Sequence, residues 1–466
     1  MTAHTSDALI VLDIGKTNAK LALLDGDGAV LAERRRPNAV LHDGPYPHLD
    51  TEGLWQWLLA TCREFAARAN VSAIVPVTHG ATAALVDAHG LVLPVPDYES
   101  AFDFDAAAAG AAYETVRPAY DETCSPLLPA GLNLGRQLAW LQQAFPHDVA
   151  RARHILMYPQ YWAWRLCGAA AGEATSLGCH TDLWNPRTQQ YSSLVQRMGW
   201  QRLLPPLAPA WASLGTLRAE VADATGLPRA CQVLCGIHDS NASLLRYLDQ
   251  DGADMPSTAP RTVLSTGTWM IAAAFGVPLD GLREDADMLA NTNALGRPVA
   301  CMRFMGGREF GELAGADPAT CALDDIERLV AQGTLALPCF AATGGPFAGR
   351  AGRIDGPTPL DARERYALAT LYTVLVTDYC LDALGAAGPV AVEGSFTANP
   401  WFGPLLAALR PGQPVSYSDD ASGTTCGGWM LRHRGKVAPG ASTPVAALPI
   451  AGLDAYRQRW LDALRV

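Results

Sequence analysis

The sequence predicts an α/β protein with two domains, and three observations support this. From Ala8 to Pro37 an apolar strand, a glycine-containing turn, a second strand, a hairpin turn and a third strand follow one another. Residues 53–69 then place apolar side chains at helical spacing, and 72–80 returns to a strand. The chain has 466 residues, more than one hydrophobic core usually holds. Alternating elements over this length indicate an α/β fold in two domains with a cleft between them.

Later parts of the chain repeat these patterns. Residues 100–225 are rich in Pro, Trp and Gly, with helical stretches expected near 134–144 and 158–166, and we expect them to form an insertion that covers a sheet edge and shapes a pocket. Residues 261–276 repeat the opening order of apolar strand, small-residue turn and apolar strand. A polar stretch at 249–260 separates the two halves. The predicted domains are therefore residues 1–245 and 246–466.

Composition excludes several classes of protein. The formal net charge is −11 with a pI near 5.4, and no run of Lys and Arg suggests a track for a nucleic-acid backbone. The eleven cysteines are scattered and lack zinc-ligand spacing, as in a reduced protein. No signal peptide and no stretch of about 18 apolar residues are found. We expect a cytoplasmic protein without a nucleic-acid or membrane partner.

The first candidate site follows the first strand, and its residues are Asp13, Gly15, Lys16, Thr17, Asn18 and Lys20. Gly-Lys-Thr also occurs in P-loops, but that motif needs a glycine where Ile10 stands and a helix where a strand follows. A strand that ends in Asp before a tight turn can instead offer backbone donors to phosphate, while the carboxylate holds hydrated Mg²⁺. The alternative is an ordinary hairpin with a capping Asp.

A second turn of this kind contains Thr266, Gly267 and Thr268, between two apolar strands. Together with the first turn it would hold phosphates from the other side, as phosphoryl transfer requires. Taken alone, the same residues also fit a hairpin turn without a ligand.

The third candidate is Asp239, preceded by His238, where a predicted strand within 231–248 ends and a helix begins. An Asp at this point can accept a proton from an attacking hydroxyl while it stays near the phosphates. Its other interpretation is a helix N-cap, because Asp is favoured there in any protein.

The fourth candidate comprises Gly394, Ser395 and Asn399, with further glycines at 423, 427 and 428. Glycine lets a flat base approach the backbone closely. Glycine-rich loops are mostly turns, so this signal has low specificity.

In this order the segments resemble the FGGY family of carbohydrate kinases, within the actin, hexokinase and Hsp70-like ATPase group. The resemblance covers almost the whole chain, from DIGKTNAKLALLDGDG through THGATAALVDAHGLVLP, GIHDSNAS and STGTW to ASGTTCGGWML. It implies two ribonuclease-H-like domains with a cleft between them, the sugar bound mainly on the first and ATP on the second. Closure of that cleft would exclude water.

The resemblance also implies roles for single residues. Asp239 would be the general base that activates a sugar hydroxyl, and Asp13 would interact with the phosphates and, through water, with Mg²⁺. The ATP-binding residues would be Asp13, Gly15, Lys16, Thr17, Asn18, Lys20, Thr266, Gly267, Thr268, Gly394, Ser395 and Asn399. The sugar contacts would be His79, Gly80, Thr175, His238 and Asp239. Two departures stand out: Lys16 replaces a small or hydroxyl residue, and Glu393 precedes a single glycine.

The leading prediction is a kinase that uses ATP and Mg²⁺ to phosphorylate a ketose, with a homodimer left open. The ketose is a pentulose such as xylulose, or a 6-deoxyhexulose such as rhamnulose or fuculose; HDSNAS is more similar to the rhamnulokinase and fuculokinase branch. One alternative is a catalytically silent sugar- or nucleotide-binding regulator on the same fold. Another is a protein-handling ATPase of the Hsp70 or actin type, for which the chain lacks a peptide-binding domain.

Overall fold

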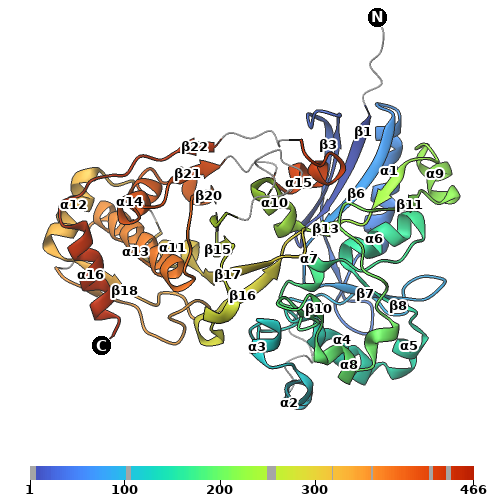
Figure 1. The fold of residues 1–466 in the computed structure, drawn as a ribbon, viewed down its shortest axis with the longest axis horizontal. Coiled ribbons are helices and arrows are strands. Elements are labelled where there is room, and N and C mark those ends of the chain that lie inside the picture. Colours follow the sequence, from blue (N-terminus) through green and yellow to red (C-terminus); the bar gives the residue numbers. More distant parts are fainter. Residues whose placement is uncertain are drawn as a thin grey trace, which may run out of the picture. The chain divides into compact units, whose positions relative to one another are not determined.

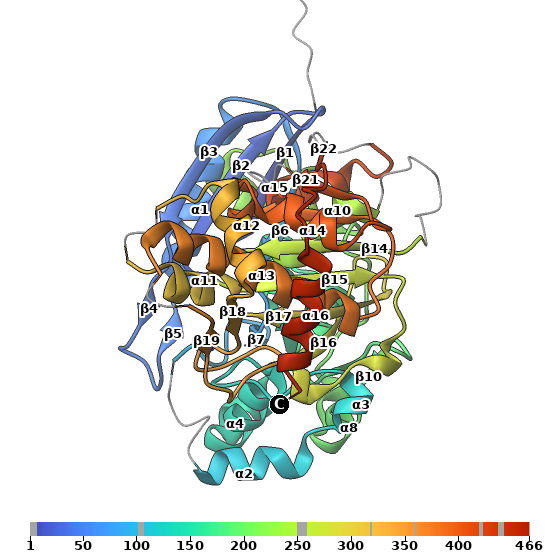
Figure 2. The ribbon, with the colours of Figure 1, turned by 90° about the vertical axis from the view of Figure 1, so that its left-hand side faces the viewer.

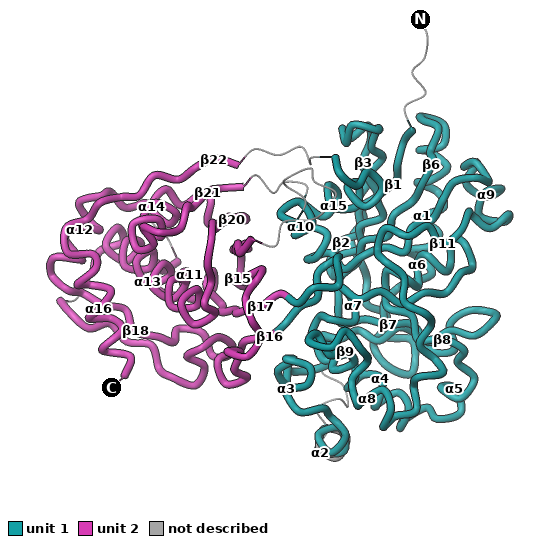
Figure 3. Tube along the Cα trace, viewed as in Figure 1, with its two compact units in different colours: residues 1–257, 290–298, 422–439 teal, residues 258–289, 299–421, 440–466 magenta. Residues whose placement is uncertain are grey.

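The chain folds into two compact units, which Figure 3 colours separately. The computed structural model describes residues 7–100, 107–248, 259–316, 319–357, 360–418, 423–436 and 442–465. Unit 1 takes its residues from 1–257, 290–298 and 422–439, and unit 2 takes them from 258–289, 299–421 and 440–466. Each unit is therefore assembled from separate stretches of the chain.

Unit 1 is built on a mixed sheet with the strand order β11-β12-β6-β1-β2-β3, and β13 also pairs with β6. The first three strands form the antiparallel meander that the opening pattern predicts, while β6 runs parallel to β1 and β13 runs parallel to β6. The strands are β1 (Ala8–Ile14), β2 (Asn18–Leu24), β3 (Val30–Pro37), β6 (Val71–Thr78), β11 (Ser213–Thr216), β12 (Gln232–Leu234) and β13 (Ile237–His238).

Register brings three strand ends to one edge of this sheet. Thr78 at the end of β6 pairs with Ile14 of β1 and with His238 of β13. Because parallel strands present their carboxyl ends at the same edge, the residues that follow them lie at that edge. These residues are Gly15, His79 and Asp239.

Helices cover both faces of the sheet in unit 1. Side chains of β1 alternate between the faces, and Ile10 and Leu12 join a buried core with α1 (Thr51–Ala66), α6 (Tyr158–Cys167) and α9 (Ala219–Thr225). Val11 points to the other face, where a Cβ on Gly428 would lie 2.7 Å from it. That face carries α10 (Asp239–Leu248) and α15 (Gly423–Arg432).

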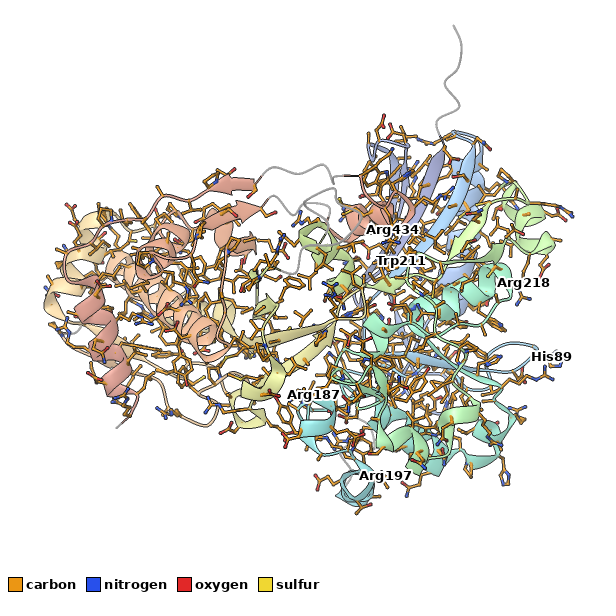
Figure 4. The ribbon with its side chains drawn as sticks, viewed as in Figure 1. His89, Arg187, Arg197, Trp211, Arg218 and Arg434 are labelled. Atoms are coloured by element: carbon orange, nitrogen blue, oxygen red, sulfur yellow. The ribbon has the colours of Figure 1, made fainter. Side chains whose placement is uncertain are left out.

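The helix α15 comes from a late part of the chain and fits closely. A Cβ on Gly427 would lie 2.0 Å from the carbonyl oxygen of Ala242, so only glycine lets α15 approach α10 this closely. Just beyond the helix, the Arg434 guanidinium lies 4.0 Å from the Trp211 ring centroid (Figure 4). Lys436 donates a hydrogen bond of 2.8 Å to the Gly26 carbonyl.

The predicted insertion forms a second buried core in unit 1. It contains α4 (Leu134–Ala144), whose bounds match the prediction, together with α2 (Ala107–Val116), α5 (Pro146–Arg151) and α8 (Ser193–Arg197). Figure 1 and Figure 2 both show α2, α4 and α8 gathered at the end of unit 1 away from β1, β2 and β3. The strand β11, from the same region, is itself an edge of the main sheet.

Unit 2 repeats the plan of unit 1, as the pattern at 261–276 predicts. Its sheet has the order β16-β17-β15-β14-β20-β21-β22, and β14, β15 and β17 form an antiparallel meander with β20 parallel to β14. The strands are β14 (Arg261–Thr266), β15 (Met270–Phe275), β16 (Met288–Thr292), β17 (Pro298–Phe304), β20 (Val390–Gly394), β21 (Val415–Ser418) and β22 (Ser442–Pro444). The predicted α/β class is confirmed in both units.

The helices of unit 2 are held partly by a buried ion-pair network. Asp378 lies on α13 (Ala362–Ala383), and its two oxygens pair with Arg410 at 2.7 Å and with Arg457 at 2.5 Å. Asp382 contacts both arginines as well. Since Arg457 lies on α16 (Leu453–Ala463), this network ties α16 to α13.

All eleven cysteines are free thiols, as the predicted reduced state requires. No helix in the described part of the chain is both long and apolar enough to cross a membrane.

Candidate functional site

Asp13 lies near the end of β1, directly opposite Lys20 of β2 in the antiparallel register. Its Oδ2 pairs with Lys20 Nζ at 3.1 Å and accepts a hydrogen bond of 2.6 Å from the Thr424 hydroxyl. Two donors on one oxygen fix the orientation of the carboxylate. Carboxylate oxygens are the ligands that Mg²⁺ prefers, and this ion keeps several of its waters. The Asp13 carboxylate therefore fits a hydrated Mg²⁺ ion.

The turn after β1 is tightly closed. Gly15 N–H donates to the Asn18 carbonyl at 2.9 Å, and the Asn38 amide donates to the Gly15 carbonyl at 2.6 Å. Thr17 and Asn18 are exposed at its tip. The strand β2 follows this turn, which confirms that it is not a P-loop.

Lys16 belongs to the same turn but pairs with carboxylates. Its Nζ lies 2.8 Å from Asp97 Oδ1 and 3.2 Å from Glu99 Oε2. Burial would lower the pKa of Lys16, but the hydrogen bond and the charge of Asp97 outweigh it and raise the pKa. With His79 and Tyr158, the side chain lines a small cavity. Lys16 therefore adds a charged pair on the His79 side of the turn.

Asp239 begins α10 directly after β13. Its Oδ1 accepts a hydrogen bond of 2.6 Å from Ser240 N–H and lies 3.2 Å from His238 Nε2. No donor among the described residues contacts its Oδ2, and 26 % of the side chain is exposed. Burial raises the pKa of Asp239 to about 6; His79 lowers it and the Asp13 charge raises it. At neutral pH the carboxylate is ionised and has one oxygen ready to accept a proton.

His238 is occupied inside unit 1 at both ring nitrogens. Its Nε2 faces Asp239, and its Nδ1 lies 3.3 Å from the Asn241 amide nitrogen. Burial lowers the pKa of His238 to about 4, so the ring is neutral at pH 7. The sugar contact of His238 stays a prediction.

Thr175 is also engaged, in a chain that leads to a buried acid. The His238 backbone N–H donates to the Thr175 hydroxyl at 3.1 Å, and that hydroxyl donates to Glu173 Oε2 at 2.5 Å. Glu173 caps the short helix α7 (Ala174–Leu177). Burial raises the pKa of Glu173 to about 7, although its hydrogen bonds from Thr175 and Ser176 oppose this.

His79 follows β6 and packs between aromatic rings. Its Nδ1 lies 3.0 Å from the Gly80 carbonyl, and its ring centroid lies 5.6 Å from Tyr98 and 5.0 Å from Tyr158. Burial lowers the pKa of His79. A Cβ on Gly80 would lie 2.8 Å from His238 Nε2, so Gly80 lets the two strand ends approach.

In unit 2, the register Thr266 to Gly394 places the loops after β14 and β20 side by side. Around them is a cavity of about 540 Å³. Its lining includes four predicted residues, Gly267, Thr268, Ser395 and Asn399. The second and fourth candidate motifs are therefore brought together around one cavity.

Thr266 and Gly394 hold together the two loops that line this cavity. The Thr266 hydroxyl donates to the Glu393 carbonyl at 2.5 Å and accepts from Phe396 N–H at 3.0 Å. Gly394 has φ of 87°, and a Cβ there would lie 2.0 Å from the Thr266 carbonyl oxygen. The Asn399 amide is held by the Thr370 hydroxyl at 3.0 Å.

Several residues of the site were not predicted. The start of α11 (Gly306–Ala314) lines the unit 2 cavity, and Gly307 N–H donates to the Gly267 carbonyl at 3.1 Å. A Gly-Gly pair after a strand was a signal that could have revealed it. Neither Thr424 nor Asp97 carries such a signal, because each meets its partner only in the folded chain.

Two family models match the chain. The N-terminal domain of the FGGY family of carbohydrate kinases matches residues 8–245. The model described as carbohydrate kinase FGGY, C-terminal domain, matches residues 258–440.

Individual proteins agree with these matches. A carbohydrate kinase structure from Novosphingobium aromaticivorans is 37 % identical, covers 99 % of both chains and has a TM-score of 0.91. A xylulose kinase structure from Rhodospirillum rubrum, 17 % identical over 98 % of both chains with a TM-score of 0.77, shares the fold. An L-fuculokinase from Salmonella typhi is 27 % identical over 278 residues, which is 57 % of this chain and little more than half, 56 %, of that relative. The chain belongs to the FGGY family of carbohydrate kinases, as its order of motifs predicted.

Proposed function

We propose that this protein is an ATP-dependent kinase that transfers the γ-phosphate to a hydroxyl of a ketose. The observation that carries this proposal is the sheet edge of unit 1, where Asp239 has one oxygen without a donor among the described residues and a pKa near 6. Gly15 begins the phosphate turn at the same edge, and Asp13 lies just before it. A base and a phosphate-binding turn at one edge suit phosphoryl transfer to a hydroxyl.

In the proposed reaction one bond to the γ-phosphorus forms and another breaks. The sugar oxygen forms a bond to the γ-phosphorus, and its proton moves to Oδ2 of Asp239. The bond between the γ-phosphorus and the β–γ bridging oxygen breaks, and ADP leaves with that electron pair. A carboxylate with a pKa about 6 is ionised at pH 7.5 but still basic enough to take the proton as the new bond forms.

The turn after β1 would bind the phosphates and help to neutralise their charge, through Asp13, Lys20 and the exposed residues at its tip. Asp13 would hold Mg²⁺ through water, and the bound ion would neutralise negative charge on the phosphates. Lys20 and Thr424 keep the Asp13 carboxylate in one orientation. Thr17 and Asn18 are exposed and offer a hydroxyl and an amide to phosphate oxygens.

ATP would occupy the unit 2 cavity. Its volume of about 540 Å³ lies within the usual range for small-molecule pockets. Gly267 and Thr268 would face the phosphates, and the segment with Gly394, Ser395 and Asn399 would face the adenosine. The aromatic residues Phe310, Tyr366 and Phe396 give the pocket an apolar wall for the base.

The sugar would bind at the His79 side of unit 1. The Nδ1 proton of His79 bonds the Gly80 carbonyl, which leaves Nε2 as an acceptor for a sugar hydroxyl. Candidate substrates are pentuloses such as xylulose and 6-deoxyhexuloses such as fuculose and rhamnulose. Among the similar proteins are a xylulose kinase and an L-fuculokinase, so both classes belong in the first assay.

The test is ADP release from Mg-ATP by purified protein, with ketopentoses, ketohexoses, 6-deoxyketohexoses, gluconate, glycerol and pentitols. A ketose-dependent rate well above the ATP-only background would support the proposal. Asp239→Asn should lower that rate by orders of magnitude while ATP still binds, and exposed Asp223→Asn on α9 is the matched control. ATP binding without turnover for every compound would favour a silent regulator.

A further inference from the structure

We propose that His238 and Asn241 are positioning residues that hold Oδ1 of Asp239 and so leave Oδ2 to accept the substrate proton. This inference rests on the proposed kinase function and deepens it. It gives His238 a role behind the base instead of a contact with the sugar.

The Asn241 amide decides which ring nitrogen of His238 carries the proton. Its Nδ2, which can only donate, lies 3.3 Å from His238 Nδ1. Nδ1 must therefore be the acceptor, and the proton of the neutral ring is on Nε2. Nε2 lies 3.2 Å from Asp239 Oδ1, so in this tautomer its proton is on the nitrogen nearest the carboxylate.

The opposite arrangement is unfavourable. With the amide reversed, Nδ1 would carry the proton, and the lone pair of Nε2 would face a carboxylate oxygen. A doubly protonated ring would satisfy both neighbours, but burial lowers the pKa of His238 to about 4 and disfavours it near neutral pH. One tautomer of His238 is therefore compatible with an ionised Asp239.

The surroundings leave the ring little freedom. Asn241 is 1 % exposed and His238 is 5 % exposed. The Thr175 hydroxyl accepts the His238 backbone N–H at 3.1 Å. Gly80 packs so closely that a Cβ there would lie 2.8 Å from Nε2. Because the His238 ring is held on these sides, it can fix the position of the Asp239 side chain, as a residue that supports a catalytic group must.

The two carboxylate oxygens of Asp239 would therefore have different roles. Oδ1 accepts the Ser240 N–H and lies 3.2 Å from the His238 ring nitrogen, whereas Oδ2 has no donor among the described residues. A donor to the ionised carboxylate lowers its pKa, because it stabilises the charged form. Other titratable groups that interact with Asp239 are His79 after β6, which lowers its pKa, Asp13 of β1, which raises it, and Tyr98, whose own pKa is raised by burial and by the Asp239 charge. Lys16 acts on His79 in turn.

The first experiment compares His238→Leu with His238→Gln in the full chain. Leucine removes the donor, whereas the Nε2 amide of glutamine can replace the ring Nε2–H. With the best ketose, kcat/KM is measured from pH 5 to 9. For His238→Leu we expect the acid limb of the pH profile, where kcat/KM falls as Asp239 is protonated, to move up by about one pH unit or more. Loss of a hydrogen-bond donor raises the pKa of the carboxylate, and hydrogen bonds to charged groups are strong. His238→Gln should restore most of the wild-type profile.

The second experiment reads the tautomer directly. In protein labelled with ¹⁵N-histidine, the His238 signals should show a neutral ring with the proton on Nε2 near pH 7. Asn241→Ala should mix the two tautomers and move the acid limb in the same direction as His238→Leu. The matched control is His89→Leu, at an exposed turn of unit 1 far from α10 (Figure 4).

Two results would overturn the inference. One is an unchanged acid limb in both His238→Leu and Asn241→Ala, with each variant folded by thermal unfolding. The other is a raised KM for the sugar without any shift of the limb, which would make His238 a sugar contact. Failure of the kinase proposal looks different, because wild-type protein would then show no ketose-dependent ADP release at any pH.

Discussion

The Thr424 hydroxyl donates to Asp13 Oδ2 at 2.6 Å, although the two residues are 411 positions apart in the sequence. The helix that carries Thr424 packs through Gly427 against Ala242 and through Gly428 against Val11. Its position is therefore set by close backbone contacts with the sheet and with α10. The orientation of the Asp13 carboxylate depends on this late helix.

Thr424→Val should weaken the use of Mg-ATP. Valine keeps the size of the side chain but removes the donor to a charged oxygen, so we expect kcat/KM for Mg-ATP to fall about tenfold. Steady-state kinetics over a series of Mg²⁺ concentrations measures this loss. Thr424→Ser keeps the hydroxyl and is the control, and equal loss in both variants would contradict the role given to the hydrogen bond.

The pH profile of the wild-type protein should report Asp239. Because burial raises its pKa to about 6, the base is protonated and inactive below that pH. We expect kcat/KM for the sugar to fall about tenfold per pH unit below 6. Asp239→Asn should lower turnover by about 10²- to 10⁴-fold and remove this limb. A wild-type profile that stays flat to pH 5 would be inconsistent with the base.

Glu173→Gln should change how stability depends on pH. The folded protein keeps the Glu173 proton up to about pH 7, whereas the unfolded chain loses it near the ordinary value of 4.5. The folded state therefore loses stability as the pH rises through this window, by about 3 kcal/mol in total. Glutamine does not titrate, so the melting temperature of Glu173→Gln minus that of wild type should rise from pH 5 to pH 8. Exposed Glu220→Gln should show no trend, and a trend of the opposite sign would refute this account.

Gly307→Ala should damage the unit 2 cavity. Its Cβ would lie 2.2 Å from the Gly267 carbonyl oxygen, so the loop that contains Thr268 must shift. We expect the Kd for ATP, measured by calorimetry, to rise about tenfold or more, which corresponds to about 1.4 kcal/mol. Gly311→Ala on the same helix meets open space and is the matched control. Normal ATP affinity in Gly307→Ala would mean that ATP binds elsewhere.

Asp378→Ala should destabilise unit 2. It removes the buried partner of Arg410 at 2.7 Å and leaves only the half-exposed Asp382 at 2.9 Å, so we expect a loss of up to about 3 kcal/mol, the lower end for breaking a buried pair. Thermal unfolding followed by circular dichroism measures the loss. Exposed Asp462→Ala removes a surface ion pair at 3.9 Å and an exposed hydrogen bond from Gln458, and it should change little. Similar melting temperatures for the two variants would show that the network contributes little.

Much of the fold and of the site could be predicted because the signals are local. Asp13 and Asp239 each lie at the end of an apolar strand, and parallel strands bring such ends to one edge. The strand after Lys16, together with the missing glycine at Ile10, excluded a P-loop. The helix 134–144 was found from its spacing alone.

Ion pairs and hydrogen bonds between distant segments of the chain could not be predicted from the sequence. Lys16 pairs with Asp97 and Glu99, which come from a loop whose approach no local pattern indicates. The contacts of His238 with Asn241 and Thr175 likewise could not be read from the sequence, and the phosphate contact of Lys16 and the sugar contact of His238 stay predictions. Hydrogen-bond partners depend on side-chain geometry, which periodicity does not encode.

The late position of α15 has a consequence for the newly made protein. Domains of a growing chain usually fold from the N-terminus as they emerge from the ribosome. The strands β1, β2, β3 and β6 are made early, but the face that carries Val11 lacks α15, one of its two helices, until residues 423–432 have been made. Until then the growing chain presents an apolar surface on which molecular chaperones can act. Chains truncated before α15 would keep that surface exposed, and we expect cells to degrade them.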